Sequence, residues 1–209
     1  MSETELARQI CCVVMLSVAS YSDIKRRHVS DIVWLIFGGI GAATYIFDPP
    51  SHDAILYIVC GIAIAIACLR IRMVGQADCL ALVALAVTFP VFVDIPVVPL
   101  VAVATPVLAS VFSLCYNLSC NISDLVFGRL FSGICEKPHR KALAFILLHR
   151  KRKYEKFVFQ AQDGCRFVFS FRKTTGCKFA DDFEGYVGSA VPLMPFMLAA
   201  LVMMLFLGL

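Results

Sequence analysis

Long apolar segments recur along the chain, and they restrict its fold more than any other feature of the sequence. Six of them are separated by polar stretches: 6–22, 29–47, 54–73, 79–93, 97–118 and 186–209. A helix needs about 20 apolar residues to cross a bilayer, and all but the first and fourth segments reach about that length. We therefore expect an all-α polytopic membrane protein, built as a bundle of about six transmembrane helices.

The composition agrees with lipid as the solvent for much of the surface. The chain is 60% hydrophobic and 16% charged, whereas a soluble domain carries about 25% charged residues. So much apolar surface cannot be buried in a core of the protein's own. The lipid bilayer is therefore an expected partner, and no nucleic acid is expected, since the net charge is only +4.

The basic residues indicate the orientation, because Lys and Arg concentrate in cytoplasmic loops. If the N-terminus is outside, Arg8 is the single base of the 19 on the outer side. Glu3 and Glu5 precede the first apolar segment, where a cleaved signal peptide carries positive charge, so we expect that segment to be retained. The sequence thus predicts a multi-pass protein of the cell membrane, with both termini outside.

One long polar segment, residues 119–185, separates the fifth and sixth apolar segments. Its basic residues, among them the run HRKRKYEK at 149–156, suit a solvated inner loop or contact with anionic headgroups. Farther on, alternating apolar residues flank Asp163-Gly164, a pattern typical of a β-hairpin. We expect three parts: a five-helix membrane region (1–118), a small cytoplasmic α+β domain with this hairpin (119–185), and the last transmembrane helix (186–209).

Other patterns point away from metal and cofactor chemistry. The ten cysteines include no Cys-x-x-Cys pair and the four histidines show no paired spacing, so no metal site and no cofactor are expected. Asn117 and Asn121 each begin an Asn-x-Ser glycosylation pattern, but on the inner side of the membrane they would stay unmodified. Asp31, directly after Ser30, is expected to cap the second helix.

Two acids, Asp23 and Asp78, are the best candidates for chemistry. Asp23 ends the first apolar segment in SYSDIKRR and Asp78 opens the fourth in VGQADCLAL, so the predicted topology places both at the inner membrane face. Two neighbouring carboxylates share one proton, so that one activates a water as general base and the other protonates the substrate. Gly75 would permit a turn into the fourth helix, and Ala77 would keep the approach open. Helix caps and membrane-edge anchors are ordinary alternative roles for such acids.

The helix ends predict different protonation states for the two acids. Asp78 lies at a helix N-terminus, where the dipole favours the anion, and Asp23 lies at a helix C-terminus, where the dipole disfavours it. We therefore expect Asp78 to be the ionised partner and Asp23 the protonated one. The basic residues that follow Asp23, from Lys25 to Arg27, oppose the second assignment.

The surroundings of both acids resemble a known family. SYSDIKRRHVSDIVW resembles the first-aspartate motif of type IV prepilin peptidases and archaeal preflagellin (prearchaellin) peptidases, which are aspartic peptidases of the GxGD type. VGQADCLAL resembles their Gly-x-Gly-Asp motif, with Ala77 in place of the second glycine. GYVGSAVPLMPFMLAALV resembles the Pro-containing last span of the archaeal branch. The resemblance implies that Asp23 and Asp78 are catalytic and that Gly75 and Ala77 support the motif; Ala77 leaves open a reduced activity, an altered substrate set or an inactive relative.

The resemblance also implies a reaction and its substrates. Members of this family remove the short basic leader peptide from archaellin or type IV pilin-like precursors at the cytoplasmic face of the membrane. Bifunctional bacterial members carry paired Cys-x-x-Cys motifs and also N-methylate their product, so cleavage without methylation is expected here, in an archaeal membrane. We expect the basic leader to meet a small group of acids: Asp181, Asp182 and Glu184.

Two other classes of protein are compatible with the sequence. A proton- or cation-coupled transporter would use the acids as ion sites, but no acid lies at the middle of an apolar segment, where transport sites usually lie. A non-catalytic membrane assembly factor of the same fold would retain the layout and would not need either aspartate for its function.

Overall fold

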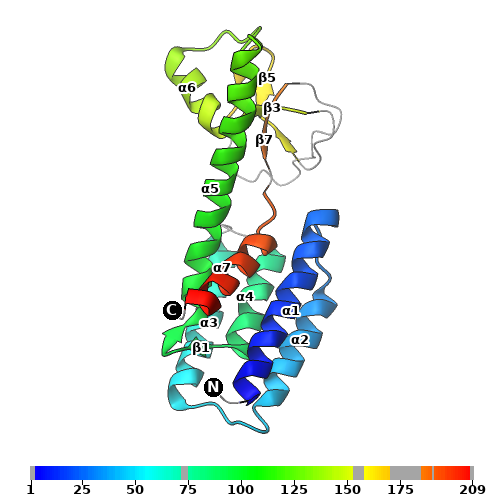
Figure 1. The fold of residues 1–209 in the computed structure, drawn as a ribbon, viewed down its shortest axis with the longest axis vertical. Coiled ribbons are helices and arrows are strands. Elements are labelled where there is room, and N and C mark those ends of the chain that lie inside the picture. The colour runs from blue at the N-terminus through cyan, green and yellow to red at the C-terminus, as the bar shows by residue number, and fades with distance from the viewer. Residues whose placement is uncertain (1–2, 72–74, 153–157, 170–184, 190, 208–209) are drawn as a thin grey trace. The chain divides into compact units, whose positions relative to one another are not determined.

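The computed structural model describes residues 3–71, 75–152, 158–169, 185–189 and 191–207. These residues are mostly helical. The chain forms two compact units, one from Met1–Ala109 with Pro192–Leu209 and the other from Ser110–Val191. The boundary between the units falls within helix α5 (Val97–Val126), which therefore contributes residues to both (Figure 1).

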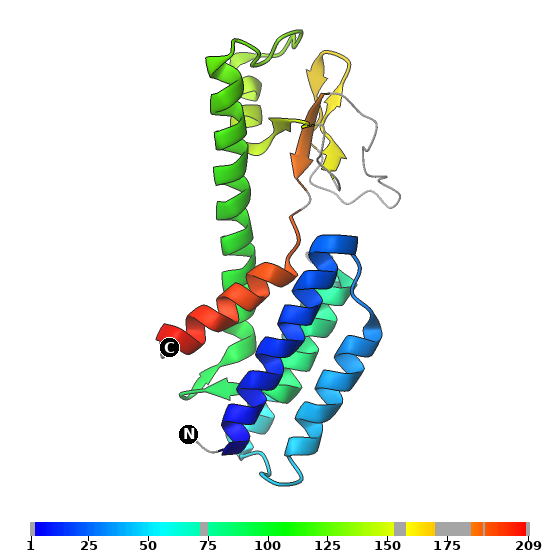
Figure 2. The ribbon, with the colours of Figure 1, turned by 45° about the vertical axis from the view of Figure 1, so that its right-hand side comes forward.

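The first unit is a helical bundle organised around α4. Besides the start of α5, its helices are α1 (Glu3–Arg26), α2 (Asp31–Thr44), α3 (His52–Ile71), α4 (Gln76–Thr88) and α7 (Met194–Leu207). Helix α4 contacts α1, α2 and α3, while α1 also packs against α2 and α7. Helices α1, α2 and α4 lie side by side in both views (Figures 1 and 2). Seven of the 13 residues of α4 are buried, so this helix forms the centre of the core.

Glycines permit the neighbouring helices to approach α4 closely. A Cβ atom at Gly41 of α2 would lie 2.7 Å from the Cβ and 2.8 Å from the Cα of Thr88 in α4. A Cβ atom at Gly61 of α3 would lie 2.8 Å from the Cβ of Ala86. Ordinary contacts of a Cβ atom begin at 3.4 Å, so any larger residue at either glycine would push the helices apart.

Helix lengths differ from the predicted pattern of six spans. Within the described ranges, two helices are long and apolar enough to cross a membrane, namely α3 and α5. Helices α2, α4 and α7 are apolar but have only 14, 13 and 14 residues. The 13 residues of α4 rise about 20 Å, less than the roughly 30 Å of a bilayer core. The count of six therefore stays a prediction, while the helical class of the protein is confirmed.

Local sequence determines where several helices begin and end. The N-cap of α2 is Ser30, whose hydroxyl accepts a hydrogen bond from the Ile32 N–H at 3.4 Å, so Asp31 is the first helical residue and not the cap. Helix α4 ends just before Phe89-Pro90, because a proline disfavours helical backbone in the residue before it. A hairpin then connects α4 to α5. Its two strands, β1 (Val91–Phe92) and β2 (Ile95–Pro96), have two residues each.

The second unit combines helices with a small sheet. Helix α6 (Pro138–Leu147) precedes a three-stranded antiparallel sheet in the order β3-β7-β4, formed by His149–Arg150, Tyr186–Ser189 and Val158–Gln160. The rings of Phe131, Phe167 and Tyr186 pack together in its core, with centroids 5.2 to 5.6 Å apart. The Tyr186 hydroxyl accepts a hydrogen bond from the Phe131 N–H at 2.8 Å.

Three boundaries in this unit differ from the expected ones. Helix α5 continues to Val126, so the polar segment expected from residue 119 begins as helix. The hairpin expected around Asp163-Gly164 has only two residues in each strand, β5 (Gln162–Asp163) and β6 (Arg166–Phe167), because β4 pairs with β7 instead. Residues 186–189, expected to begin the last helix, form β7 because β3 and β4 both pair with them; the helix starts at Met194.

Two asparagines of α5 cap the C-terminal end of α6. The side-chain amides of Asn117 and Asn121 donate hydrogen bonds to the carbonyl oxygens of residues 145–148, the shortest being 2.6 Å from Asn121 Nδ2 to the Leu148 oxygen. A helix end leaves its last four carbonyls without partners in the helix itself. Both asparagines are buried, so their Asn-x-Ser patterns coincide with a structural role.

Candidate active site

Asp23 lies in the last turn of α1, and its carboxylate contacts the start of α7. Its Oδ2 atom accepts a hydrogen bond from the backbone N–H of Met194 at 3.3 Å. Met194 is the first residue of α7, and its side chain is buried in the core. The Asp23 carboxylate therefore lies between the end of its own helix and the start of another. Which of the two acids holds the proton stays a prediction.

Asp78 lies in the first turn of α4, and its carboxylate folds back over the residue that caps the helix. Its Oδ2 atom accepts a hydrogen bond from the Gly75 N–H at 2.9 Å. Gly75 has φ −70° and ψ 161°, an extended conformation that any residue adopts, so the turn itself does not require glycine. A Cβ atom at this position would lie 2.9 Å from Asp78 Oδ2, so the carboxylate at the end of that side chain would have to move.

The two carboxylates line a single pocket of about 360 Å³ in the first unit. Four helix ends surround it: the end of α1 and the starts of α2, α4 and α7. The lining residues are Asp23, Arg27, His28, Val29, Asp31, Gly75, Gln76, Ala77, Asp78 and Met194. Asp23 and Asp78 are both half-buried, so each side chain is partly exposed to solvent and partly packed against protein.

Arg27 places a positive charge in the same pocket. It follows the last residue of α1 with φ 54°, a left-handed conformation that is unusual for arginine, and its N–H donates to the Asp23 carbonyl at 3.0 Å. Burial lowers the pKa of the Arg27 guanidinium, and the negative charge of Asp23 raises it. Arginine stays charged at neutral pH, so Arg27 supplies a positive charge among the residues that line the pocket.

The structure brings together the predicted residues that it describes. The pocket is lined by all four motif residues: Gly75, Ala77, Asp23 and Asp78. The acids expected to receive the leader lie outside the described residues: Asp181, Asp182 and Glu184. Sequence reasoning missed His28, Asp31 and Met194 as pocket residues. Proximity in sequence to Asp23 is a signal for the first two, but no local pattern connects Met194 to a residue 171 positions away.

Comparison with known proteins identifies one family for this chain. The model of the type IV leader peptidase family matches residues 10–114, half of the chain, and the matched range contains both aspartates. Comparisons with curated proteins and with solved structures return no significant match. Since the matched range covers α2, α3, α4, most of α1 and the first half of α5, the chain belongs to the type IV leader peptidase family.

Proposed function

We propose that the chain is a membrane-embedded aspartic endopeptidase in which Asp23 and Asp78 cleave the leader peptide from type IV pilin-like precursors. The observation that carries the proposal is the shared pocket. Two acids that are 55 positions apart (78 − 23) lie on different helices and line the same 360 Å³ cavity. Family membership independently supports leader cleavage as the reaction class.

The proposed reaction uses the two carboxylates as a coupled acid and base. The ionised carboxylate takes a proton from a water molecule while the water oxygen attacks the scissile carbonyl carbon. The protonated carboxylate gives its proton to the carbonyl oxygen, forming a tetrahedral intermediate. The C–N bond then breaks, the carbonyl forms again, and a proton passes to the leaving amine. The overall reaction consumes one water and leaves the enzyme in its starting protonation state.

The contacts of the two acids bear on which one holds the proton. Asp23 accepts a hydrogen bond from the first residue of α7, and Asp78 accepts one from the residue that caps α4. Each carboxylate accepts a hydrogen bond at the start of a helix, so the helix dipole no longer separates the two roles. We therefore assign the shared proton to the pair and not to one of the two acids.

The proposal extends to membrane placement and substrates. Many large apolar side chains on α1, α2 and α3 are exposed, for example Leu35, Ile36 and Leu56, which suits lipid contact. We propose a multi-pass protein of an archaeal cell membrane, with both termini outside and the pocket at the cytoplasmic face, in line with the distribution of Lys and Arg. Its substrates would be archaellin or pilin-like precursors, cleaved without N-methylation, and the acids Asp181, Asp182 and Glu184 would receive the basic leader.

The test is leader cleavage of an archaellin or pilin precursor in membranes that contain the wild type, Asp23→Asn or Asp78→Asn at equal expression. Each variant should lower the cleavage rate by about 10²-fold or more. Asp94→Asn is the matched control, because Asp94 is exposed in the hairpin turn with φ 61°, a conformation that asparagine adopts readily. If both site variants cleaved the precursor at the wild-type rate, Asp23 and Asp78 would have only helix-capping roles. That result would favour an assembly factor or a transporter.

A further inference from the structure

Two cysteines of the second unit lie next to each other, although they are 30 positions apart in sequence (165 − 135). Cys135 lies between α5 and α6, and Cys165 lies in the turn between β5 and β6. The backbone N–H of Cys135 donates a hydrogen bond to the carbonyl of Cys165 at 3.0 Å. Both residues are exposed and both thiols are free, so small reagents in solution have access to the pair.

The hydrogen bond brings the two backbones within the reach of a disulfide. Residues that are hydrogen-bonded across two neighbouring strands have Cα atoms about 5.5 Å apart. A disulfide joins residues whose Cα atoms are about 4.4–6.8 Å apart. The backbone therefore need not move far for a bond between Cys135 and Cys165, and rotation about χ1 of the two exposed side chains supplies the remaining adjustment.

Polar contacts next to the pair fix the two segments against each other. Glu136 Oε1 accepts a hydrogen bond from the Phe167 N–H at 3.0 Å and forms an ion pair with Arg140 Nη1 at 2.9 Å. Arg140 Nη2 in turn donates to the Phe167 carbonyl at 2.6 Å. The Glu136 side chain is only 6% exposed. The segment that carries Cys135 therefore cannot leave the hairpin that carries Cys165 without breaking these contacts.

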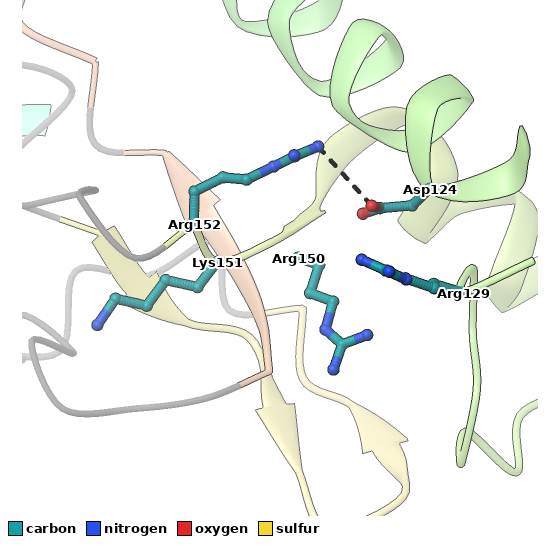
Figure 3. A pocket seen from close by; sticks show the side chains of 5 residues that line it. All are labelled: Asp124, Arg129, Arg150, Lys151 and Arg152. Atoms are coloured by element: carbon teal, nitrogen blue, oxygen red, sulfur yellow. Dashed lines mark ion pairs between the residues drawn. The ribbon is translucent and has the colours of Figure 1, made fainter. Parts of the chain in front are cut away.

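Among the residues that the structure describes, the second unit is held together without covalent cross-links. At the end of α5, for example, Asp124 Oδ1 lies 3.7 Å from Arg152 Nη2, in a pocket whose other lining residues are basic (Figure 3). Neither Cys135 nor Cys165 lines this pocket. A disulfide between them would add a covalent link from the α5–α6 connection to the β5–β6 hairpin and would leave the pocket lining unchanged.

We propose that Cys135 and Cys165 are a redox modification site that forms a reversible intramolecular disulfide, with a small-molecule disulfide as the oxidant. This site goes beyond the proposed peptidase function and does not depend on it.

The reaction is a pair of thiol–disulfide exchanges. One protein thiol, as its thiolate, attacks a sulfur of the oxidant, which forms a mixed disulfide and releases one small thiol. The second protein thiol then attacks the protein sulfur of the mixed disulfide and releases the other small thiol. The protein loses two electrons, the oxidant gains them, and the two protein thiol protons pass to the released thiols. An excess of small thiol reverses both steps.

The test uses the purified full chain in detergent, equilibrated in buffers of reduced and oxidised glutathione. Remaining free thiols are blocked with N-ethylmaleimide, and the protein is digested with trypsin without reduction. The two cysteines fall in separate tryptic peptides, LFSGICEKPHR (130–140) and FVFQAQDGCR (157–166), and each peptide contains a single cysteine. Mass spectrometry of the two peptides joined together therefore identifies this disulfide and no other.

The joined peptides should appear in the wild type and disappear after treatment with dithiothreitol. The matched control is Cys115→Ser, at another exposed cysteine of the same unit, which should keep the link. The variant Cys165→Ser leaves Cys135 without its neighbour, so glutathione can only form a mixed disulfide there. At about 1 mM reduced glutathione, the wild-type pair should be half-oxidised at about tenfold less oxidised glutathione than half-modifies Cys135 in this variant, because the second exchange is intramolecular.

The wild-type measurement stands without any variant, so a folding defect in a variant cannot produce or hide the result. Absence of the joined peptides from the oxidised wild type would overturn the proposal. A dominant link from either peptide to a different cysteine, or a link found only in disulfide-joined dimers on a non-reducing gel, would do the same. So would half-oxidation of the pair at the concentration of oxidised glutathione that half-modifies Cys135 in Cys165→Ser.

Discussion

Gly41→Ala tests whether close contact between α2 and α4 holds the first unit together. The new Cβ atom would lie 2.8 Å from the Cα of Thr88, whereas ordinary contacts begin at 3.4 Å. The backbones must therefore separate by 0.6 Å (3.4 − 2.8), since the nearest obstacle includes main chain and cannot rotate away. Overpacking of this kind costs about 1–3 kcal/mol. Against this, alanine stabilises a helix by about 0.5–1 kcal/mol relative to glycine.

Gly39→Ala separates these two effects. Gly39 lies in the same helix, is exposed, and has no atom within 4 Å of the position where its Cβ would be. It receives the same gain in helix propensity without the contact. The difference in the free energy of unfolding between the two variants therefore reports packing alone, and we expect Gly41→Ala to be less stable than Gly39→Ala by about 1–3 kcal/mol.

The assay is denaturant titration of purified protein in detergent micelles, followed by tryptophan fluorescence. Trp34 is the single tryptophan of the chain, lies in α2 and is only 6% exposed, so its emission reports the environment of the helix that is perturbed. Equal midpoints for the two alanine variants would refute the reasoning, because the predicted separation of α2 from α4 would then cost nothing measurable.

Gly75→Ala should displace the Asp78 carboxylate from its backbone donor and lower the cleavage rate in membranes by about tenfold; an unchanged rate would show that this contact is dispensable. Asn121→Leu removes two hydrogen bonds from the end of α6. Hydrogen-exchange measurements should show the second unit destabilised by about 1–3 kcal/mol, whereas Ser119→Ala, at an exposed position of the same helix, should leave its stability unchanged. Burial raises the pKa of Tyr186 above 10.0, so the stability that its neutral phenol contributes is full below pH 10.0 and is lost as pH rises through the folded pKa. An absorbance titration should show a late tyrosine step whose amplitude Tyr186→Phe reduces; an unchanged amplitude in that variant would contradict the assignment.

Much of the helical layout follows from local patterns in the sequence. Apolar segments of helical length predicted the first residues of α1 to α5 to within three positions, whereas α5 ends eight residues later than predicted (126 − 118). The short motifs around Asp23 and Asp78 led to the family that the comparison then confirmed. Both signals are contained in continuous stretches of chain, and this is why they can be recognised without a structure.

The remaining features depend on residues that are far apart in sequence. Residues 186–189 are apolar enough to begin a helix, and only pairing with β3 and β4 makes them a strand. The electrostatics of the site also depend on residues far apart in sequence. The Asp23 carboxylate contacts the start of α7, which is 171 positions away along the chain. The role of Asn117 and Asn121 as caps of another helix likewise has no local signature.

The proposed catalytic residue Asp78 and the close contact at Thr88 lie at opposite ends of α4, and this separation has a testable consequence. Asp78 lies in the first turn of the helix and Thr88 is its last residue, so about 15 Å of helix separates the pocket from the Gly41 contact. If α4 tilts as a rigid rod about its first turn, a displacement of 0.6 Å at Thr88 becomes smaller toward Asp78, at the pocket end of the helix. Gly41→Ala should therefore lower stability more than the cleavage rate, whereas Gly75→Ala should lower the cleavage rate more than stability. If Gly41→Ala instead reduced cleavage as strongly as Gly75→Ala at a temperature where both variants are folded, α4 would have to move as a whole, and the position of Asp78 would depend on the packing of the entire bundle.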